Sequence, residues 1–357
     1  MEPNSKVQRD YLIVGQGIAG SLVALNLMER GKSVLVVDDG HKHAASKVAA
    51  GLINPITGRR HALTWRFLEF WEFLQGDYAR WTELLGHPFL MPKPLLRFFR
   101  NEEEQALFEK KWKAGDFEGI NVTYPGDLEP VPFCKYEGPS YGLSQTGYVK
   151  QGLFIDLARQ YLESKSALQE DSWSEADFSR ESGRVSWKGV SAKAVIFTQG
   201  YLASENTFFK ELPFRHARGE ILELSGPDRH DAPVLNRGKW LLPTGNGSFK
   251  AGATYDLKNI NQEVTNSGPE EILDEVQKMV EGEFKIQSAS SGVRPALHDF
   301  KPVMGKHPWY PELVIFNGLG SKGSLQAPLL ARELVEHLEE GVPLHPQADM
   351  DRFRKYL

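Results

Sequence analysis

The sequence predicts an α/β protein in which a parallel, helix-flanked sheet is interrupted by an antiparallel sheet with α+β character. A short apolar strand runs through a glycine-rich turn into a helix and a second strand over residues 10–40. Another buried strand, glycine-rich turn and helix follow each other at 313–338. Short apolar segments at 221–224 and 239–253 are typical of antiparallel sheet. We therefore expect one domain assembled from both ends of the chain, with a second domain inserted into it.

The first glycine-rich turn has the spacing that binds the diphosphate of a dinucleotide. A short apolar run leads into Gly15, Gly17 and Gly20, and the second strand ends at Asp38. Gly15 permits a sharp turn, Gly17 leaves the backbone open to a diphosphate, and Gly20 lets the helix lie close to the strand. The start of that helix attracts phosphate, and Asp38 can accept hydrogen bonds from a ribose. The alternative is a glycine turn in some other βαβ unit, and the spacing does not separate NAD from FAD.

Composition and charge limit the possible partners. The 357 residues suffice for two domains, and the net charge of −5 offers no basic surface for nucleic acid or an anionic membrane. The single cysteine, Cys134, excludes an intrachain disulfide and a multi-cysteine metal site, and the histidines show no metal-binding spacing. The polar N-terminus lacks the apolar core of a signal peptide, so we expect a cytoplasmic protein. The oligomeric state is not indicated.

The remaining elements follow from apolar spacing and turn residues. Helical spacing predicts further helices at 64–85, 101–113, 152–164, 269–280 and 327–338. Short apolar runs predict strands at 172–178, 184–187, 194–197 and 313–316. The turn Thr244–Gly247 predicts a hairpin between the two strands beside it.

Four further sequence motifs follow the first glycine turn along the chain. They are Ser46–Leu52, the strand ending at Gly200, the segment Gly292–Gly305 with its RP…D…P…G pattern, and Gly318–Ser324. Together with the first turn, they resemble the D-amino-acid oxidase/glycine oxidase family of FAD-dependent oxidoreductases over essentially the whole chain. The C-terminal NGLGSKGSLQAP stretch is most similar to the oxidase domain of bifunctional tRNA wobble-uridine modification enzymes.

This resemblance implies both a domain organisation and a cofactor. A Rossmann-like FAD-binding domain would comprise residues 1–85, 147–213 and 294–357, and the antiparallel substrate domain would comprise 86–146 and 214–293. The cofactor would be FAD rather than NAD. It would be bound non-covalently, since the lone cysteine lies outside the motifs.

The resemblance also implies which residues contact FAD. The first turn would face the diphosphate, the 46–52 loop would cover the phosphates and flavin, and Gly200 would lie near the adenine. The last turn would present N–H groups to the flavin N1/C2=O edge, although a plain helix start is the alternative there. The expected cofactor-binding set is Gly15, Gly17, Ile18, Ala19, Gly20, Asp38, Ser46, Ala50, Gly51, Leu52, Gly200, Gly318, Gly320, Ser321, Lys322, Gly323 and Ser324.

Three residues are implied in catalysis. Arg294 would hold a substrate carboxylate, because a guanidinium makes a two-pronged, charge-assisted contact; the alternative is a structural salt bridge near Asp299. Lys322 would lie near the flavin and assist oxygen activation, or else be solvated. Trp240 stands where relatives often carry a tyrosine that lines the pocket. The tryptophan lacks that hydroxyl, so the resemblance does not identify the substrate. For Arg218, a structural role is the better interpretation.

The function implied is oxidation of the C–N bond of an amino acid or secondary amine. A hydride would pass to flavin N5, the imine would hydrolyse, and oxygen or another acceptor would reoxidise the flavin. Two alternatives remain: an oxidase of the carboxymethylaminomethyl side chain of a tRNA wobble uridine, acting with a partner, and a flavoprotein subunit of a larger dehydrogenase. A small-molecule amine is the expected partner, and neither nucleic acid nor a membrane is expected.

Overall fold

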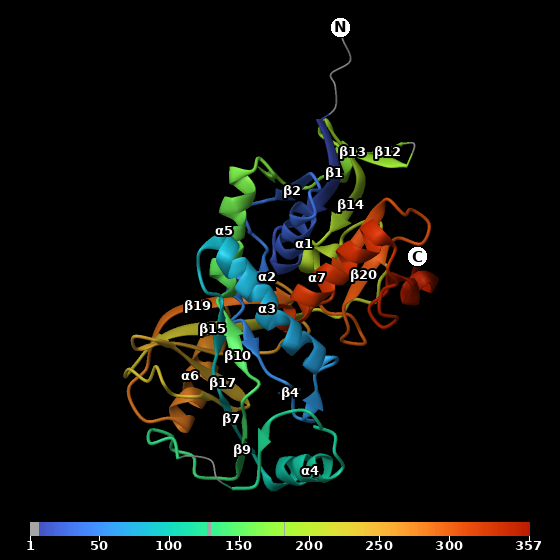
Figure 1. Ribbon diagram of the computed structural model, residues 1–357. Coiled ribbons are helices and arrows are strands. Elements are labelled where there is room, and N and C mark those ends of the chain that lie inside the picture. Colours follow the sequence, from blue (N-terminus) through green and yellow to red (C-terminus); the bar gives the residue numbers. More distant parts are fainter. Residues whose placement is uncertain (1–6, 127–129, 182) are drawn as a thin grey trace.

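Two large sheets dominate the fold. A computed structural model describes residues 7–126, 130–181 and 183–357. The parallel sheet, with β1, β2 and β14, occupies the upper half of Figure 1, and the antiparallel sheet, with β15, β17, β7 and β9, occupies the lower half. Helices α1, α3, α5 and α7 lie together beside the parallel sheet, whereas α6 lies with the antiparallel sheet.

The parallel sheet has the order β11–β2–β1–β14–β21, and these five strands all run parallel. Antiparallel β20 lies next to β21, and antiparallel β13 and β12 extend from β14. The strands are β1 (Val7–Val14), β2 (Val34–Asp38), β11 (Leu168–Glu170), β12 (Phe178–Glu181), β13 (Arg184–Trp187), β14 (Val190–Phe197), β20 (Val303–Lys306) and β21 (Leu313–Asn317).

Both faces of the sheet are buried at its centre, which explains why β2 and β21 are almost entirely apolar and why β1 and β14 end in apolar runs. Tyr11 and Ile13 face the cluster formed with the helices, whereas Leu12 and Val14 face a second cluster on the other side. The helices are α1 (Ile18–Glu29), α3 (Phe67–Leu85), α5 (Gln151–Ser164) and α7 (Gly323–Glu340).

The antiparallel sheet has the order β19–β15–β18–β17–β16–β7–β9–β8, in which only β16 and β7 run parallel. Helix α6 (Gly268–Met279) packs on one face through Ile272 and Val276, against Leu222 and Leu241. The strands are β7 (Leu95–Phe98), β8 (Val122–Thr123), β9 (Ser140–Leu143), β15 (Ala217–Ser225), β16 (Val234–Arg237), β17 (Lys239–Gly245), β18 (Ser248–Gly252) and β19 (Lys285–Arg294).

Short elements complete the chain. A small sheet pairs β3 (Leu52–Ile53), β10 (Gly147–Val149) and β6 (Leu90–Pro92), and a hairpin pairs β4 (Ile56–Thr57) with β5 (Ala62–Leu63). The remaining helices are α2 (Ala45–Val48), α4 (Glu102–Lys113) and the 3₁₀ segments η1 (Glu175–Asp177), η2 (Gly200–Ser204) and η3 (Met350–Tyr356). No helix of the described residues has the length and apolar character needed to cross a bilayer.

The predicted elements are present with one exception, but several observed strands were not predicted, among them β7, β9, β16 and β19. Each predicted helix is present within a few residues, and the predicted strand at 172–178 is wrong, because β12 begins only at Phe178. The parallel sheet draws its strands from residues 7–38, 168–197 and 303–317, and the antiparallel sheet draws its strands from the segments between these. The domain boundaries stated above stay a prediction.

Candidate cofactor and substrate site

A cavity of about 1080 Å³ is lined by residues from both large sheets. The carboxyl ends of β1, β2 and β14 contribute Val14, Asp38 and Thr198, which is the edge where ligands of parallel sheets bind. The antiparallel sheet contributes Ile221 and Trp240. The cavity exceeds the usual size of a small-molecule pocket, so it has room for an extended ligand beside a small one.

Most of the predicted site residues line this one cavity, although they are widely separated in the sequence. They are Gly15, Gly17, Ile18, Ala19, Asp38, Ser46, Ala50, Gly51, Leu52, Gly200, Trp240, Arg294, Gly320, Ser321, Lys322, Gly323 and Ser324.

Gly20 and Gly318 are the predicted cofactor residues that do not line it. A Cβ at Gly20 would lie 1.9 Å from the Gly15 carbonyl oxygen, and a Cβ at Gly318 would lie 2.3 Å from Leu297 Cδ1. Both glycines therefore permit close packing behind the cavity wall.

The first turn has the local geometry expected of a diphosphate-binding loop. Gly15 has a φ of +98°, and a Cβ there would lie 2.7 Å from the Thr198 carbonyl oxygen. Gly17, in contrast, has an extended backbone, and its nearest obstacle to a Cβ is the Ser46 hydroxyl at 3.2 Å. The backbone at Gly17 is thus open on the cavity side, as close approach of a diphosphate requires.

Two helix N-termini open onto the cavity, and neither has a side-chain cap from its own N-cap residue. The Ser46 hydroxyl accepts the N–H of Ile18 at 3.2 Å, while the N–H of Ala19 has no acceptor among the described residues. At α7, the N–H groups of Gly323 and Ser324 likewise lack one in the part of the chain described. Unsatisfied N–H groups and the positive end of the helix dipole suit an anion or a polar ligand edge. The residues present therefore fit a dinucleotide.

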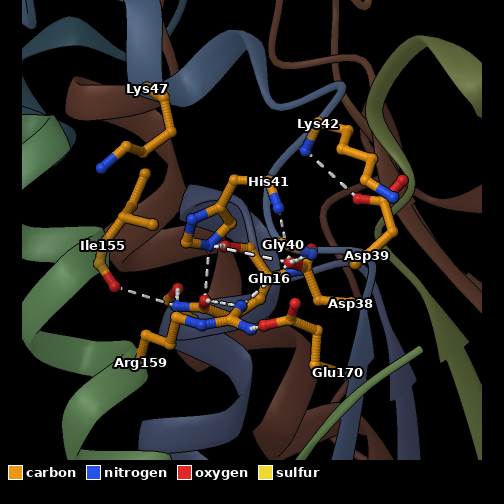
Figure 2. A network of polar contacts seen from close by, with 12 residues as sticks. Gln16, Asp38, Asp39, Gly40, His41, Lys42, Lys47, Ile155, Arg159 and Glu170 are labelled. Atoms are coloured by element: carbon orange, nitrogen blue, oxygen red, sulfur yellow. Dashed lines mark hydrogen bonds and ion pairs between the residues drawn. The ribbon is translucent and has the colours of Figure 1, made fainter. Parts of the chain in front are cut away.

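Asp38 is the centre of a polar network beside the first turn (Figure 2). One carboxylate oxygen accepts the N–H of Gln16 at 2.8 Å, and the other accepts the N–H groups of Gly40 and His41 at 3.0 and 2.9 Å. Arg159, from α5, donates to the second oxygen at 3.1 Å. Asp38 therefore shapes the glycine loop itself, in addition to any contact with a ribose.

The other members of this network were not predicted. The Gln16 side-chain amide donates to Ser21 Oγ and to the Ile155 carbonyl, both at 3.0 Å, which ties the loop to α5. His41 Nε2 contacts Gln16 Oε1, and burial lowers the pKa of the His41 imidazole. Figure 2 shows the His41 and Arg159 side chains converging on Gln16. No local pattern distinguishes Arg159 from the other charged residues of its helix.

Arg294 is a partly buried cation without an acidic partner among the described residues. Its Nη1 donates to the carbonyl of Arg218 at 3.2 Å, and Nη1 and Nη2 lie 3.5 and 3.4 Å from the carbonyl of Thr254. Asp299 pairs with Arg352 at 3.4 Å instead, so the structural salt bridge considered as an alternative is not formed. Burial lowers the pKa of the Arg294 guanidinium, because its positive charge is partly removed from water without a carboxylate to compensate it.

Lys322 and Trp240 occupy the same cavity. The Lys322 ammonium has no hydrogen-bond acceptor or ion pair among the described residues, and burial lowers the pKa of Lys322 to about 8. The Trp240 indole lies over Gly252, where a Cβ would be 2.8 Å from Cζ2. Arg218 is instead buried against Asp256 at 3.2 Å, and it does not line the cavity. Within the described residues, no group of histidines, cysteines and carboxylates is arranged to hold a metal ion.

These features define a dinucleotide-binding α/β protein whose cavity also extends to the antiparallel sheet. A family model described as FAD dependent oxidoreductase matches residues 10–337. The chain belongs to that family, and its cofactor is FAD.

Individual relatives have low sequence identity to this chain, but the similarity extends over most of it. The tRNA 5-methylaminomethyl-2-thiouridine biosynthesis bifunctional protein MnmC of Marinobacter nauticus is 26% identical over 92% of this chain, and the chain spans 55% of that protein's length. A glycine oxidase of Bacillus licheniformis is 21% identical over 89% of this chain and 90% of its own.

Among solved structures, the glycine oxidase from Geobacillus kaustophilus matches with a TM-score of 0.80, at 20% identity over 95% of this chain and 96% of its own. The iminodiacetate oxidase from Chelativorans matches with a TM-score of 0.78, at 20% identity over 95% and 98%. At these identities the structural likeness concerns the fold alone.

Proposed function

We propose that the protein oxidises the C–N bond of an amino acid or secondary amine that carries a carboxylate. The observation that supports this most directly is the Arg294 guanidinium, which is partly buried in the cavity wall and has two carbonyl groups and the Tyr255 ring as its described partners, but no carboxylate. A buried charge without a counter-ion is costly, and a bidentate carboxylate would offset that cost. The open helix N-termini in the same cavity supply the cofactor side of the site.

The chain's own residues would bind and orient the substrate. Arg294 anchors the carboxylate, and Trp240 bounds the cavity on the side of the antiparallel sheet. FAD, when bound, supplies the hydride acceptor at N5, which oxygen or another acceptor restores to the oxidised form. The start of α7 would stabilise negative charge at the N1/C2=O edge, a role in which Lys322 is also well placed to assist. The substrate amine must be neutral to react, so the rate should rise with pH, and the imine then hydrolyses.

We also propose that FAD is held non-covalently. Cys134 does not line the cavity, and its thiol lies 3.4 Å from the Met279 carbonyl on the α6 side of the antiparallel sheet. A small-molecule amine as the partner and a cytoplasmic location complete this proposal.

The test is anaerobic reduction of the flavin by pairs of amines that differ only in a carboxylate. Arg294→Lys should keep the flavin but reduce the efficiency with carboxylate substrates by about 30- to several thousand-fold, since losing a buried charge-assisted pair costs about 2–5 kcal/mol. Amines without a carboxylate should be affected little. Arg60→Lys is the matched control, because Arg60 is exposed and lies outside the cavity lining. Equal losses for both members of a pair would count against the carboxylate role.

A second candidate is oxidation of a tRNA side chain together with a partner. The similarity to the Marinobacter protein favours it, and the carboxymethylaminomethyl group expected there also carries a secondary amine and a carboxylate. The two candidates differ in substrate size. Flavin bleaching by free amino acids supports the first, and bleaching only by tRNA bearing that group supports the second.

A further inference from the structure

We propose that Gly219 is a positioning residue: it seats the Arg294 guanidinium against β15 and thereby sets the preference for substrates with a carboxylate. This inference rests on the proposed function of Arg294. It concerns a residue in the middle of a strand, where a glycine weakens the strand and often marks the close approach of another group.

The seat follows from the pairing of β15 with β19. Ala217 lies opposite Arg294, and Gly219 lies opposite Gly292. A Cβ built on Gly219 would lie 2.0 Å from Arg294 Nη2 and 2.4 Å from both Nη1 and Cζ. The guanidinium therefore occupies the space that a side chain at position 219 would need.

The need for glycine here is one of space and not of backbone conformation. Gly219 does not have the positive φ that only glycine adopts readily. Ala217 and Ile221, two residues away on either side, point to the same face of β15 and carry side chains. The opposing Gly292 has room, since its nearest neighbour would lie 3.4 Å from a Cβ. The gap under Arg294 is thus specific to position 219.

The seat orients the donors of Arg294. The carbonyl contacts of Nη1 and Nη2 with Arg218 and Thr254 account for three of the five N–H groups of the guanidinium. At least two N–H groups remain for an anion in the cavity. Because a guanidinium is planar, holding one side against the strand determines the direction in which the free donors point.

Gly219→Ala should move the guanidinium without unfolding the protein. The guanidinium must retreat by more than about 1 Å to reach an ordinary contact, and it is the free end of a flexible side chain. A misplacement of about 1 Å can cost about 100-fold in rate. We expect a 10- to 100-fold lower efficiency of anaerobic flavin reduction by carboxylate amines, with unchanged reduction by the matching amines without a carboxylate. Flavin content and the thermal unfolding midpoint should stay those of the unmodified protein.

A double-mutant cycle separates positioning from general damage. In an Arg294→Met background, Gly219→Ala should have no further effect on any substrate, because the group that it displaces is absent. Gly76→Ala is the control for the glycine replacement itself, since no atom lies within 4 Å of a Cβ built at that position in α3. Additive losses in the cycle, or equal losses for amines with and without a carboxylate, would overturn the inference.

Binding of acetate to the FAD-loaded protein, followed by the shift in flavin absorbance, tests the seat without turnover. Acetate should bind at least 10-fold more weakly after Gly219→Ala, and equal binding would refute the seat. If no amine reduces the flavin of the unmodified protein while acetate binding still weakens, the proposed oxidation is wrong and the anion seat stands.

Discussion

Removal of the Asp38 carboxylate is the sharpest test of how the chain retains FAD. In the structure, the two oxygens accept three backbone N–H groups and one guanidinium N–H, from Gln16, Gly40, His41 and Arg159. Hydrogen bonds to a charged group are worth about 1.5–3 kcal/mol each. Loss of a ribose contact alone would therefore weaken FAD binding about 10- to 100-fold. Asp38→Ala also frees the first glycine turn, so we expect a loss of more than about 100-fold.

Titration of the FAD-free protein with FAD, followed by flavin fluorescence, measures this loss. Asp38→Asn keeps one oxygen and should fall between Asp38→Ala and the unmodified protein. Arg159→Met should weaken binding less than Asp38→Ala, because the three backbone contacts of Asp38 remain. Asp156→Ala is the matched control, since Asp156 pairs with Lys47 outside the cavity lining. An Asp38→Ala protein that binds FAD within about threefold of normal would refute the reasoning.

Three further predictions concern the cavity wall. Gly17→Val should abolish FAD binding but leave the unfolding midpoint of the FAD-free protein near normal, because only the Ser46 side chain lies within 4 Å of a new Cβ; full flavin content would contradict this. Lys322→Met should stabilise the FAD-free protein by about 3 kcal/mol at pH 7, because burial lowers the pKa of Lys322 from 10.5 to about 8. Between about pH 8 and 10.5, Lys322 is deprotonated in the folded protein and protonated in the unfolded chain, so the unmodified protein gains stability as the pH rises. The stability difference between the Lys322→Met variant and the unmodified protein should therefore shrink. Denaturant unfolding at pH 7 and 9.5 measures this difference, and an equal difference at both pH values would contradict the prediction. Gly51→Ala should cost at least about 2 kcal/mol in the same assay, since Gly51 has a φ of +72° and a Cβ would lie 1.9 Å from the Val149 carbonyl oxygen; an unchanged midpoint would contradict it.

The sequence predicts well the parts of the fold that local patterns encode. The hairpin of β17 and β18 is an example: Gly245 pairs with Ser248, and Asn246 and Gly247 between them have φ values of 52° and 68°, as an Asn-Gly turn requires. The first βαβ unit is similar, because strand, glycine turn and helix are adjacent in the sequence. Each of these elements is specified by residues within one short segment.

The wrong strand at 172–178 shows where local patterns mislead. Trp173 stacks on Trp187 with ring centroids 5.7 Å apart, within the cluster that covers one face of the parallel sheet. An aromatic residue of an irregular segment can pack against the sheet as Trp173 does, and its spacing from other apolar residues along the sequence is then the same as in a strand. Only the surrounding tertiary structure separates the two.

The sequence predicted which glycines line the site, but it did not predict most of the side-chain contacts there. The glycine turns can be recognised from the spacing of their glycines in the sequence, and most of these glycines line the cavity. Arg159 lies 121 residues from Asp38 in the chain, and Gly219 lies 75 residues from Arg294. Neither pairing has a local signature, because both arise from the register of elements that meet only in the folded chain.

The end of β19 has a consequence for how the protein would discriminate between substrates. The residue after Arg294 is Pro295, and its carbonyl accepts the N–H of Gly320 at 2.7 Å, in the turn that leads into α7. The proposed carboxylate anchor and the flavin-side turn are thus joined through one peptide unit and one hydrogen bond, with no hinge between them. The distance between the carboxylate anchor and the flavin would then be fixed. A substrate would react only when its carboxylate and its reactive carbon are separated by a matching distance. Extending the substrate by one methylene between these groups should then slow reduction far more than extending it beyond the amine.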